Sequence, residues 1–243
     1  MTTIIGIDCA AQPENTGLAL GQLRDGALAV SALAQERDRE AMLATLSAWI
    51  PAAEPALLAI DAPLGWPAAL GDELAGHTAG APLTAPPNAM FRRATDDFVK
   101  RHIGKQPLDV GADRIARAAH AALALLDDLG RRAGARIPLA FEPAPSSILS
   151  AIEIYPAATL LHYGISPRGY KKAADIAGRR RIIDAMTALM TIPGELDDTL
   201  LASADQLDAA ICLLAGADFL RGRCAVPEDR ALAAREGWIW VPR

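Results

Sequence analysis

Five acidic residues stand where a sheet and a helix would bring carboxylates together. Asp8, Asp61 and Glu153 lie at or near the ends of three short apolar runs that are typical of buried strands. Asp205 and Asp208 are three positions apart in an apolar stretch, so on a helix they share one face. Because ligand sites of α/β proteins gather where strands end, we expect these acids to converge on one site.

A cluster of this composition favours a hard divalent cation. Carboxylate oxygens without His or Cys partners match Mg²⁺ or Mn²⁺ better than Zn²⁺. Crowded carboxylates repel one another and their pKa values rise, so bound cations would relieve the repulsion. Two ions about 4 Å apart would stabilise the attacking and leaving oxygens of a phosphoryl transfer. The predicted metal ligands are Asp8, Asp61, Asp205 and Asp208, and the predicted catalytic residues are these four and Glu153.

Each acid also has an ordinary structural interpretation. Asp8 and Asp61 could simply begin turns, where Asp is common. Asp205 follows Ser203 near a helix start, in a pattern that resembles a capping box. Glu153 would then be an exposed strand residue. We favour the metal site because three predicted strands end alike.

Two clusters of basic residues, at positions 92–101 and 168–181, would form a phosphate-binding rim if both fold over the acids. Charge runs are more often solvated faces, and Arg179–Arg181 in particular suit the outer face of a helix. The predicted substrate-binding residues are Arg92, Lys171 and Lys172.

Composition and charge limit the classes of function. With 243 residues, 51% hydrophobic and only 5% aromatic, the chain can bury a core of helices packed on a sheet, which predicts the α/β class. A net charge of -5 argues against wholesale non-specific binding of nucleic acid but leaves room for a local basic groove. The three cysteines have no CxxC spacing and no apolar stretch reaches membrane length, so we expect a cytoplasmic protein without disulfides or a membrane partner.

The predicted elements run in the order strand, hairpin, helix, strand, helix, strand, helix. Arg24-Asp25-Gly26 between two apolar runs is typical of the hairpin turn. Residues 62–147 are predicted to form an insertion of helices and loops within one domain spanning 1–243, since so long a stretch is rarely plain loop. The expected strands are 3–8, 16–23, 27–33, 56–63 and 148–156, with a short one at 236–242, and the expected helices are 37–50, 110–129, 182–190 and 200–220.

Seven motifs spread over almost the whole chain carry a resemblance to a known family. They are Gly6-Ile7-Asp8, Ile60-Asp61-Ala62-Pro63-Leu64-Gly65, Phe91-Arg92-Arg93-Ala94-Thr95-Asp96, Glu153-Ile154-Tyr155-Pro156, Tyr170-Lys171-Lys172, Asp205-Gln206-Leu207-Asp208-Ala209-Ala210 and Glu236-Gly237-Trp238-Ile239. In this combination the chain resembles the domain-of-unknown-function 429 family, described as predicted nucleases. It also resembles the ribonuclease H-like superfamily, particularly Holliday-junction resolvases of the RuvC type, which implies a ribonuclease H-like mixed sheet.

The resemblance also implies roles for individual acids. By position, Asp8 matches the metal ligand on the first strand, Asp61 the acid of the fourth strand, and Asp205 with Asp208 the acids of the last helix. Resolvases of this type generally carry a glutamate where this chain has Asp61, which is one methylene shorter. The place of Glu153 follows from the closer family alone.

Together these features predict a divalent-metal-dependent phosphodiesterase that acts on nucleic acid by a two-metal mechanism. Two alternatives stay open: a phosphotransferase or phosphohydrolase acting on a small nucleotide, and a non-catalytic binding protein with the same fold. An actin-like, ATP-dependent phosphotransferase is disfavoured, because it needs two such domains and 243 residues are too few. The sequence does not distinguish DNA, RNA and small nucleotides as substrates, and it does not give the oligomeric state.

Overall fold

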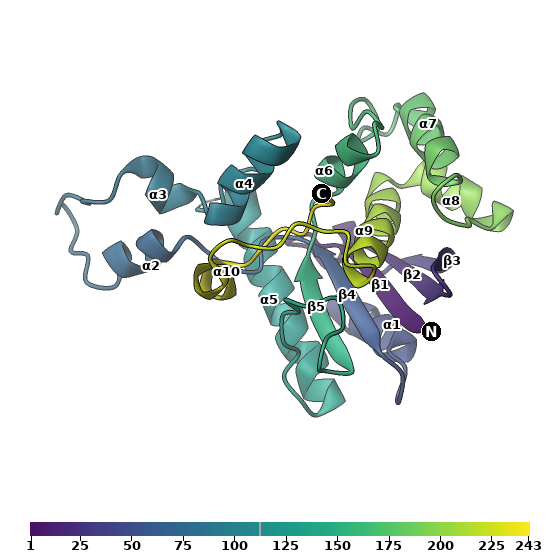
Figure 1. Ribbon diagram of the computed structural model, residues 1–243, viewed down its shortest axis with the longest axis horizontal. Coiled ribbons are helices and arrows are strands. Elements are labelled where there is room, and N and C mark those ends of the chain that lie inside the picture. Colours follow the sequence, from purple (N-terminus) through teal and green to yellow (C-terminus); the bar gives the residue numbers. More distant parts are fainter. Residues whose placement is uncertain (112) are drawn as a thin grey trace.

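A five-stranded mixed sheet forms the centre of the computed structural model, which describes residues 1–111 and 113–243 (Figure 1). The strands are β1 Thr2–Asp8, β2 Gly17–Arg24, β3 Ala27–Gln35, β4 Ala56–Asp61 and β5 Leu149–Glu153. They lie in the order β3-β2-β1-β4-β5, with β2 antiparallel to both neighbours and with β1, β4 and β5 parallel. The predicted α/β class is therefore confirmed, and β1 is the central strand.

A tight turn joins β2 to β3, as the sequence predicts. Asp25 and Gly26 have positive φ angles of 50° and 81°. A two-residue hairpin turn needs this left-handed geometry at both positions, and Asp-Gly provides it at little steric cost.

Helices cover both faces of the sheet, because successive strand residues point to opposite sides. The covering helices are α1 Arg39–Trp49, α5 Asp113–Ala133, α7 Ile176–Met186 and α9 Ala204–Leu220. Ile5 and Ile7 of β1 belong to the core shared with α1 and α5, whereas Ile4 belongs to the core shared with α7 and α9. A strand buried on both faces must be apolar almost throughout, which explains the uninterrupted runs of β1 and β4.

Helix α9 lies directly against β1 because the contact contains a glycine. A Cβ atom on Gly6 would lie 2.0 Å from the backbone oxygen of Ala209, so any larger residue would push the helix away. The glycine of the Gly-Ile-Asp motif thus sets the distance between the acid end of β1 and the first turns of α9.

The predicted helix 200–220 is two helices, α8 Asp197–Ala202 and α9, separated by Ser203. Ser203 has extended backbone angles, φ -120° and ψ 117°, and its side chain accepts a hydrogen bond from the backbone N–H of Gln206. It is therefore the N-cap of α9. The prediction of one continuous helix was wrong, because the apolar spacing continues across Ser203. The hydrogen bond of the Ser203 side chain marks the boundary between the two helices.

Helix α7 also ends earlier than predicted, at Met186 rather than Met190. The chain beyond it runs along the edge strand β3, where Thr191 exchanges backbone hydrogen bonds with Leu28 and Val30. A helical Thr191 could not make these bonds with the edge strand, so the helix must end before this residue.

The predicted insertion contains three short helices before α5, and α2 and α3 lie at the far end of the molecule from the strands (Figure 1). The remaining elements are α2 Ala68–Leu74, α3 Pro87–Phe91, α4 Ala94–Ile103, α6 Pro156–His162, α10 Arg230–Glu236 and the 3-10 turns Pro13–Asn15 and Gly194–Leu196. Within the described residues, no helix is both long and apolar enough to cross a membrane.

The C-terminal tail differs from the predicted strand at 236–242. Its first residue, Glu236, ends α10, and Ile239 and Pro242 form only isolated bridges, to Glu153 and Cys224. Trp238 and Trp240 are buried, at 5% and 3% exposure, so both pack back on the body as expected.

Candidate metal centre

Two of the predicted ligands lie side by side at one edge of the sheet. Asp8 and Asp61 are the last residues of β1 and β4, and they are register partners in this parallel pair. Register partners point to the same face of a sheet, so the two carboxylates are neighbours. Strand pairing alone therefore brings together two of the four predicted ligands.

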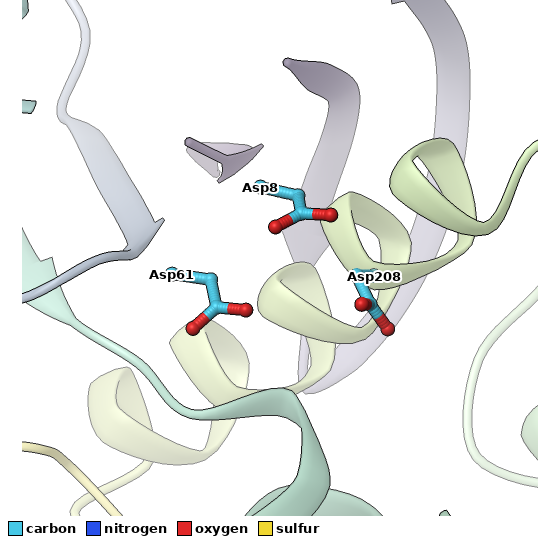
Figure 2. Close-up of side chains that lie close together, drawn as sticks. All are labelled: Asp8, Asp61 and Asp208. Carbon is cyan, nitrogen blue, oxygen red and sulfur yellow. The ribbon is translucent and has the colours of Figure 1, made fainter. Parts of the chain in front are cut away.

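Helix α9 brings the third carboxylate, Asp208, across to the strand ends. One oxygen from each of Asp8, Asp61 and Asp208 lies within 4.8 Å of the other two. Figure 2 shows the three side chains gathered between the two strand ends and the helix. Three predicted ligands that are up to 200 positions apart in the sequence thus meet at one point.

Asp208 is fully buried and both of its oxygens are engaged. The hydroxyl of Tyr170 donates to its Oδ1 at 2.8 Å, and the ammonium of Lys171 pairs with its Oδ2. The side chain of Lys171 is 55% exposed, so its cation reaches the site from the solvent side. Tyr170 was not among the predicted site residues, although it directly precedes Lys171 in the Tyr-Lys-Lys motif.

The electrostatics of the centre favour a cation. Burial raises the pKa of Asp8 to about 7, while the Lys171 ammonium opposes this rise and Asp205 adds to it. Burial also raises the pKa of Asp61 well above its usual range, and the neighbouring Asp8 adds to the effect. Three carboxylates and one ammonium carry a formal charge of about -2 when ionised, which one divalent cation would neutralise.

The residues present fit a magnesium- or manganese-type ion. They offer carboxylate oxygens only, from three separate elements, at a spacing that one ion could bridge. The adjacent thiol of Cys9 is an unsuitable ligand or nucleophile, because burial raises its pKa to about 12 and keeps it protonated.

Asp205 lies at the beginning of α9 and is outside the group of three. Its Oδ2 accepts a hydrogen bond from Gln35 at 3.1 Å, and Ser203 donates to the same glutamine. It nevertheless acts on the pKa of Asp8. The structure therefore brings Asp205 to the rim of the centre, next to the edge strand β3.

Glu153 is also outside the group, because a buried arginine holds it. Arg93 donates two hydrogen bonds to Glu153, at 2.7 and 2.8 Å, and two more to Asp96. The backbone N–H of Leu64 donates to Glu153 as well. Glu153 is 3% exposed and therefore buried, not on the surface. Its hydrogen bonds with Leu64 and Arg93 connect the insertion to the end of β5.

The predicted basic rim is only partly present. Arg93 and Arg179 are both 2% exposed, and Arg179 donates to the backbone oxygens of Tyr170, Lys172, Ala173 and Leu201. Arg92 pairs with Asp109 at 3.3 Å. Lys172 is exposed, and the described residues offer its ammonium no ion pair. Of the three predicted substrate-binding residues, Lys171 is the one that contacts the acids.

Comparison with known proteins identifies a family but no activity. The model of a family described as "Protein of unknown function (DUF429)" matches residues 6–232, a range that includes Asp8, Asp61, Glu153, Asp205 and Asp208. The comparisons with curated proteins and with solved structures returned no match.

Proposed function

The chain belongs to the DUF429 family, and from the geometry of its acidic site we propose that it is a divalent-metal-dependent phosphodiesterase acting on a nucleic acid or a nucleotide. Mg²⁺ or Mn²⁺ is the proposed cofactor, because carboxylates alone form the ligand set. The observation that carries the proposal is the convergence of Asp8, Asp61 and Asp208, from two strands and one helix, within 4.8 Å.

The two strand acids are available to a cation, whereas Asp208 already has protein partners. In the described part of the chain no group donates a hydrogen bond to Asp8 or Asp61, while Tyr170 and Lys171 both contact Asp208. Carboxylates that are partly removed from water without such partners are costly in free energy, which is why burial raises the pKa of both. A bound ion would restore their charged forms at neutral pH.

Each residue of the centre has a proposed role. A divalent ion held there would lower the pKa of a coordinated water and stabilise charge on a phosphate ester. Lys171 would place a positive charge against a non-bridging phosphate oxygen. Tyr170 fixes the orientation of Asp208, and so acts as a positioning residue.

A two-ion site is the fuller form of the proposal. Asp205 would be the added ligand, since it is close enough to Asp8 to affect its pKa and its side chain accepts a hydrogen bond from the exposed Gln35. The strand order and the paired acids of β1 and β4 agree with the ribonuclease H-like arrangement that the sequence resemblance implies. Glu153 would support the site through Arg93 rather than bind the ions.

Cleavage assays with Mg²⁺, Mn²⁺ and EDTA test this function. The substrates are single-stranded, duplex and branched nucleic acids and the small diester bis(p-nitrophenyl) phosphate. We expect metal-dependent cleavage that Asp8→Asn and Asp208→Asn each reduce by at least about a hundredfold. Asp198→Asn, an exposed acid on α8 away from the centre, is the matched control and should retain full activity.

Circular dichroism would establish that the variants are folded. Cleavage that persists in both Asp→Asn variants would contradict the proposal, as would a failure to cleave any of the four substrates. A folded protein that also binds no divalent ion would instead be a non-catalytic member of the family.

A further inference from the structure

A cavity of about 510 Å³ lies beside the metal centre. Asp61 and Lys171 form the part of its wall that belongs to the centre, and Tyr155 lies next to them. A molecule in this cavity would therefore touch the reacting site directly.

The other walls of the cavity are mostly apolar, apart from the buried Arg93–Glu153 ion pair and Arg114. They include Pro107 and Leu108 of the insertion, Ile115 of α5 and Ile154 at the end of β5. Arg114 adds one exposed cation at the wall. A concave, largely apolar space with a few polar groups at one end is the usual form of a small-molecule site, and its volume is within the range such sites have.

A larger hollow of about 780 Å³ lies elsewhere, between the end of α5 and α10. None of the three centre carboxylates lines it, and two of its charged residues, Asp127 and Arg131, are paired with each other. The larger cavity is therefore not the candidate ligand site. The smaller cavity is the candidate, because Asp61 of the centre lines it.

Four arginines of the two basic clusters at 92–101 and 168–181 are not free to hold the phosphates of a polymer. Arg93 and Arg179, from the two basic clusters, are buried on carboxylates and backbone oxygens, while Arg92 and Arg180 pair with Asp109 and Asp197. Affinity for a nucleic acid polymer comes largely from cations that neutralise successive phosphates. Among the described residues, Lys171 and Arg114 are the exposed cations that line the cavity, and they suffice for one phosphate group. The cavity wall does not include the other exposed cations of the two clusters, which are Lys100, Arg101, Arg168, Lys172 and Arg181.

We propose that the cavity binds the organic part of a compact phosphate ester, of the class of a single nucleotide, and that the phosphate lies between Lys171 and the acids. This inference rests on the proposed phosphodiesterase function and narrows its substrate class from nucleic acids to small molecules. The apolar wall and the ring of Tyr155 suit a flat ring such as a nucleobase, and the cation of Arg114 would contact the ligand at the rim.

Binding is the first test, and it does not depend on turnover. Calorimetry with thymidine 5′-monophosphate in Mg²⁺ should give one site per chain. Ile115→Trp, which fills the cavity, should weaken binding about tenfold or more. Leu108→Trp narrows the cavity at a residue that is 55% exposed, so it should fold normally and weaken binding in the same direction.

Arg114→Ala has a matched control one turn further along α5, because Arg117 is also exposed but does not line the cavity. We expect Arg114→Ala to weaken binding and Arg117→Ala to leave it unchanged. Equal affinity in the wild type, Leu108→Trp and Arg114→Ala would overturn the inference.

Turnover is the second test. The wild type should cleave thymidine 5′-(p-nitrophenyl phosphate) with a kcat/KM at least about tenfold above that for a single-stranded oligonucleotide, and Leu108→Trp should lower it mainly through KM. Efficient cleavage of the oligonucleotide that thymidine 5′-monophosphate does not inhibit would overturn the inference while leaving the phosphodiesterase intact. Conversely, cavity-dependent binding without any cleavage would contradict the phosphodiesterase and leave the binding site standing.

Discussion

In the described part of the chain, Lys171 is the cation that pairs with the acids of the centre. It neutralises the fully buried Asp208, which would otherwise be a charged group in the core, and it lowers the pKa of Asp8 and Asp61 against the effect of burial. A cation of the protein and a metal ion therefore compete for the same negative charge. This competition gives Lys171 two separable effects, on metal affinity and on catalysis.

We predict that Lys171→Met increases Mg²⁺ affinity by about threefold to tenfold and lowers kcat by about tenfold or more. Affinity rises because the formal charge of the centre becomes more negative, and kcat falls because the phosphate loses its cationic partner. Isothermal titration calorimetry and steady-state kinetics measure the two effects.

Lys172→Met is the matched control for this prediction. It removes the same charge one position along the chain, from a side chain that contacts none of the three acids among the described residues. Identical behaviour of the two variants, or weaker Mg²⁺ binding by Lys171→Met, would mean that Lys171 does not act at the centre.

At the scale of elements, the buried network around Arg93 connects three segments that are distant in the sequence. Arg93 is the N-cap residue of α4 and Glu153 is the last residue of β5. The backbone oxygen of Glu236, at the end of α10, also accepts a hydrogen bond from Arg93. The side chain of Glu236 in turn accepts from the backbone N–H groups of Ala68 and Ala94. The network thus anchors the insertion, whose residues form part of the cavity wall, to the sheet.

We predict that Arg93→Met lowers the free energy of unfolding by about 3–5 kcal/mol, because it leaves Glu153 buried without its charge partner. Arg92→Met is the matched control, because Arg92 makes only a partly exposed pair with Asp109, and its loss should cost about 1 kcal/mol or less. Urea denaturation followed by circular dichroism measures both. A cost for Arg93→Met as small as that for Arg92→Met would show that the network contributes little.

Sequence periodicity predicts elements well where the structure depends on local patterns. The Asp25-Gly26 turn, the apolar strands and helix α1 all follow from neighbours in the chain. The pairing of Arg93 with Glu153 could not be predicted, because 60 residues separate them and each looks like an ordinary surface charge. The break at Ser203 does have a local signal, because a serine three positions before Gln206 is typical of a helix N-cap, although the apolar spacing continues across it.

At the scale of the whole molecule, three of the four predicted metal ligands meet because topology brings them together. Two acids that end neighbouring parallel strands in register lie side by side. The sequence pattern implies this arrangement for Asp8 and Asp61, because each ends an apolar strand. The contact with Asp208 further requires α9 to approach β1 closely, which Gly6 permits. The cavity was beyond prediction, because its wall combines residues from the insertion, α5 and β5 whose arrangement has no local signature.

The stability of the whole chain should report on the centre through its pH dependence. The pKa of Asp8 is about 7 in the folded protein and 3.8 in its ordinary state, so between these values the folded state binds a proton that the unfolded state has released. The free energy of unfolding of the metal-free protein therefore falls as pH rises through this window, and Asp61 acts in the same direction. We predict a loss on the order of a few kcal/mol between about pH 5 and pH 8.

Mg²⁺ should reverse this loss at about pH 8, because it binds the ionised carboxylates of the folded state and not the unfolded chain. Urea denaturation in EDTA and in Mg²⁺, at several pH values, measures both effects, and Asp8→Asn should flatten the metal-free profile and remove most of the Mg²⁺ stabilisation. A metal-free wild type that becomes more stable from pH 5 to pH 8 would contradict the burial of these carboxylates in the folded state. So would a profile that Asp8→Asn leaves unchanged, because Asp8 would then have no measurable part in the predicted slope.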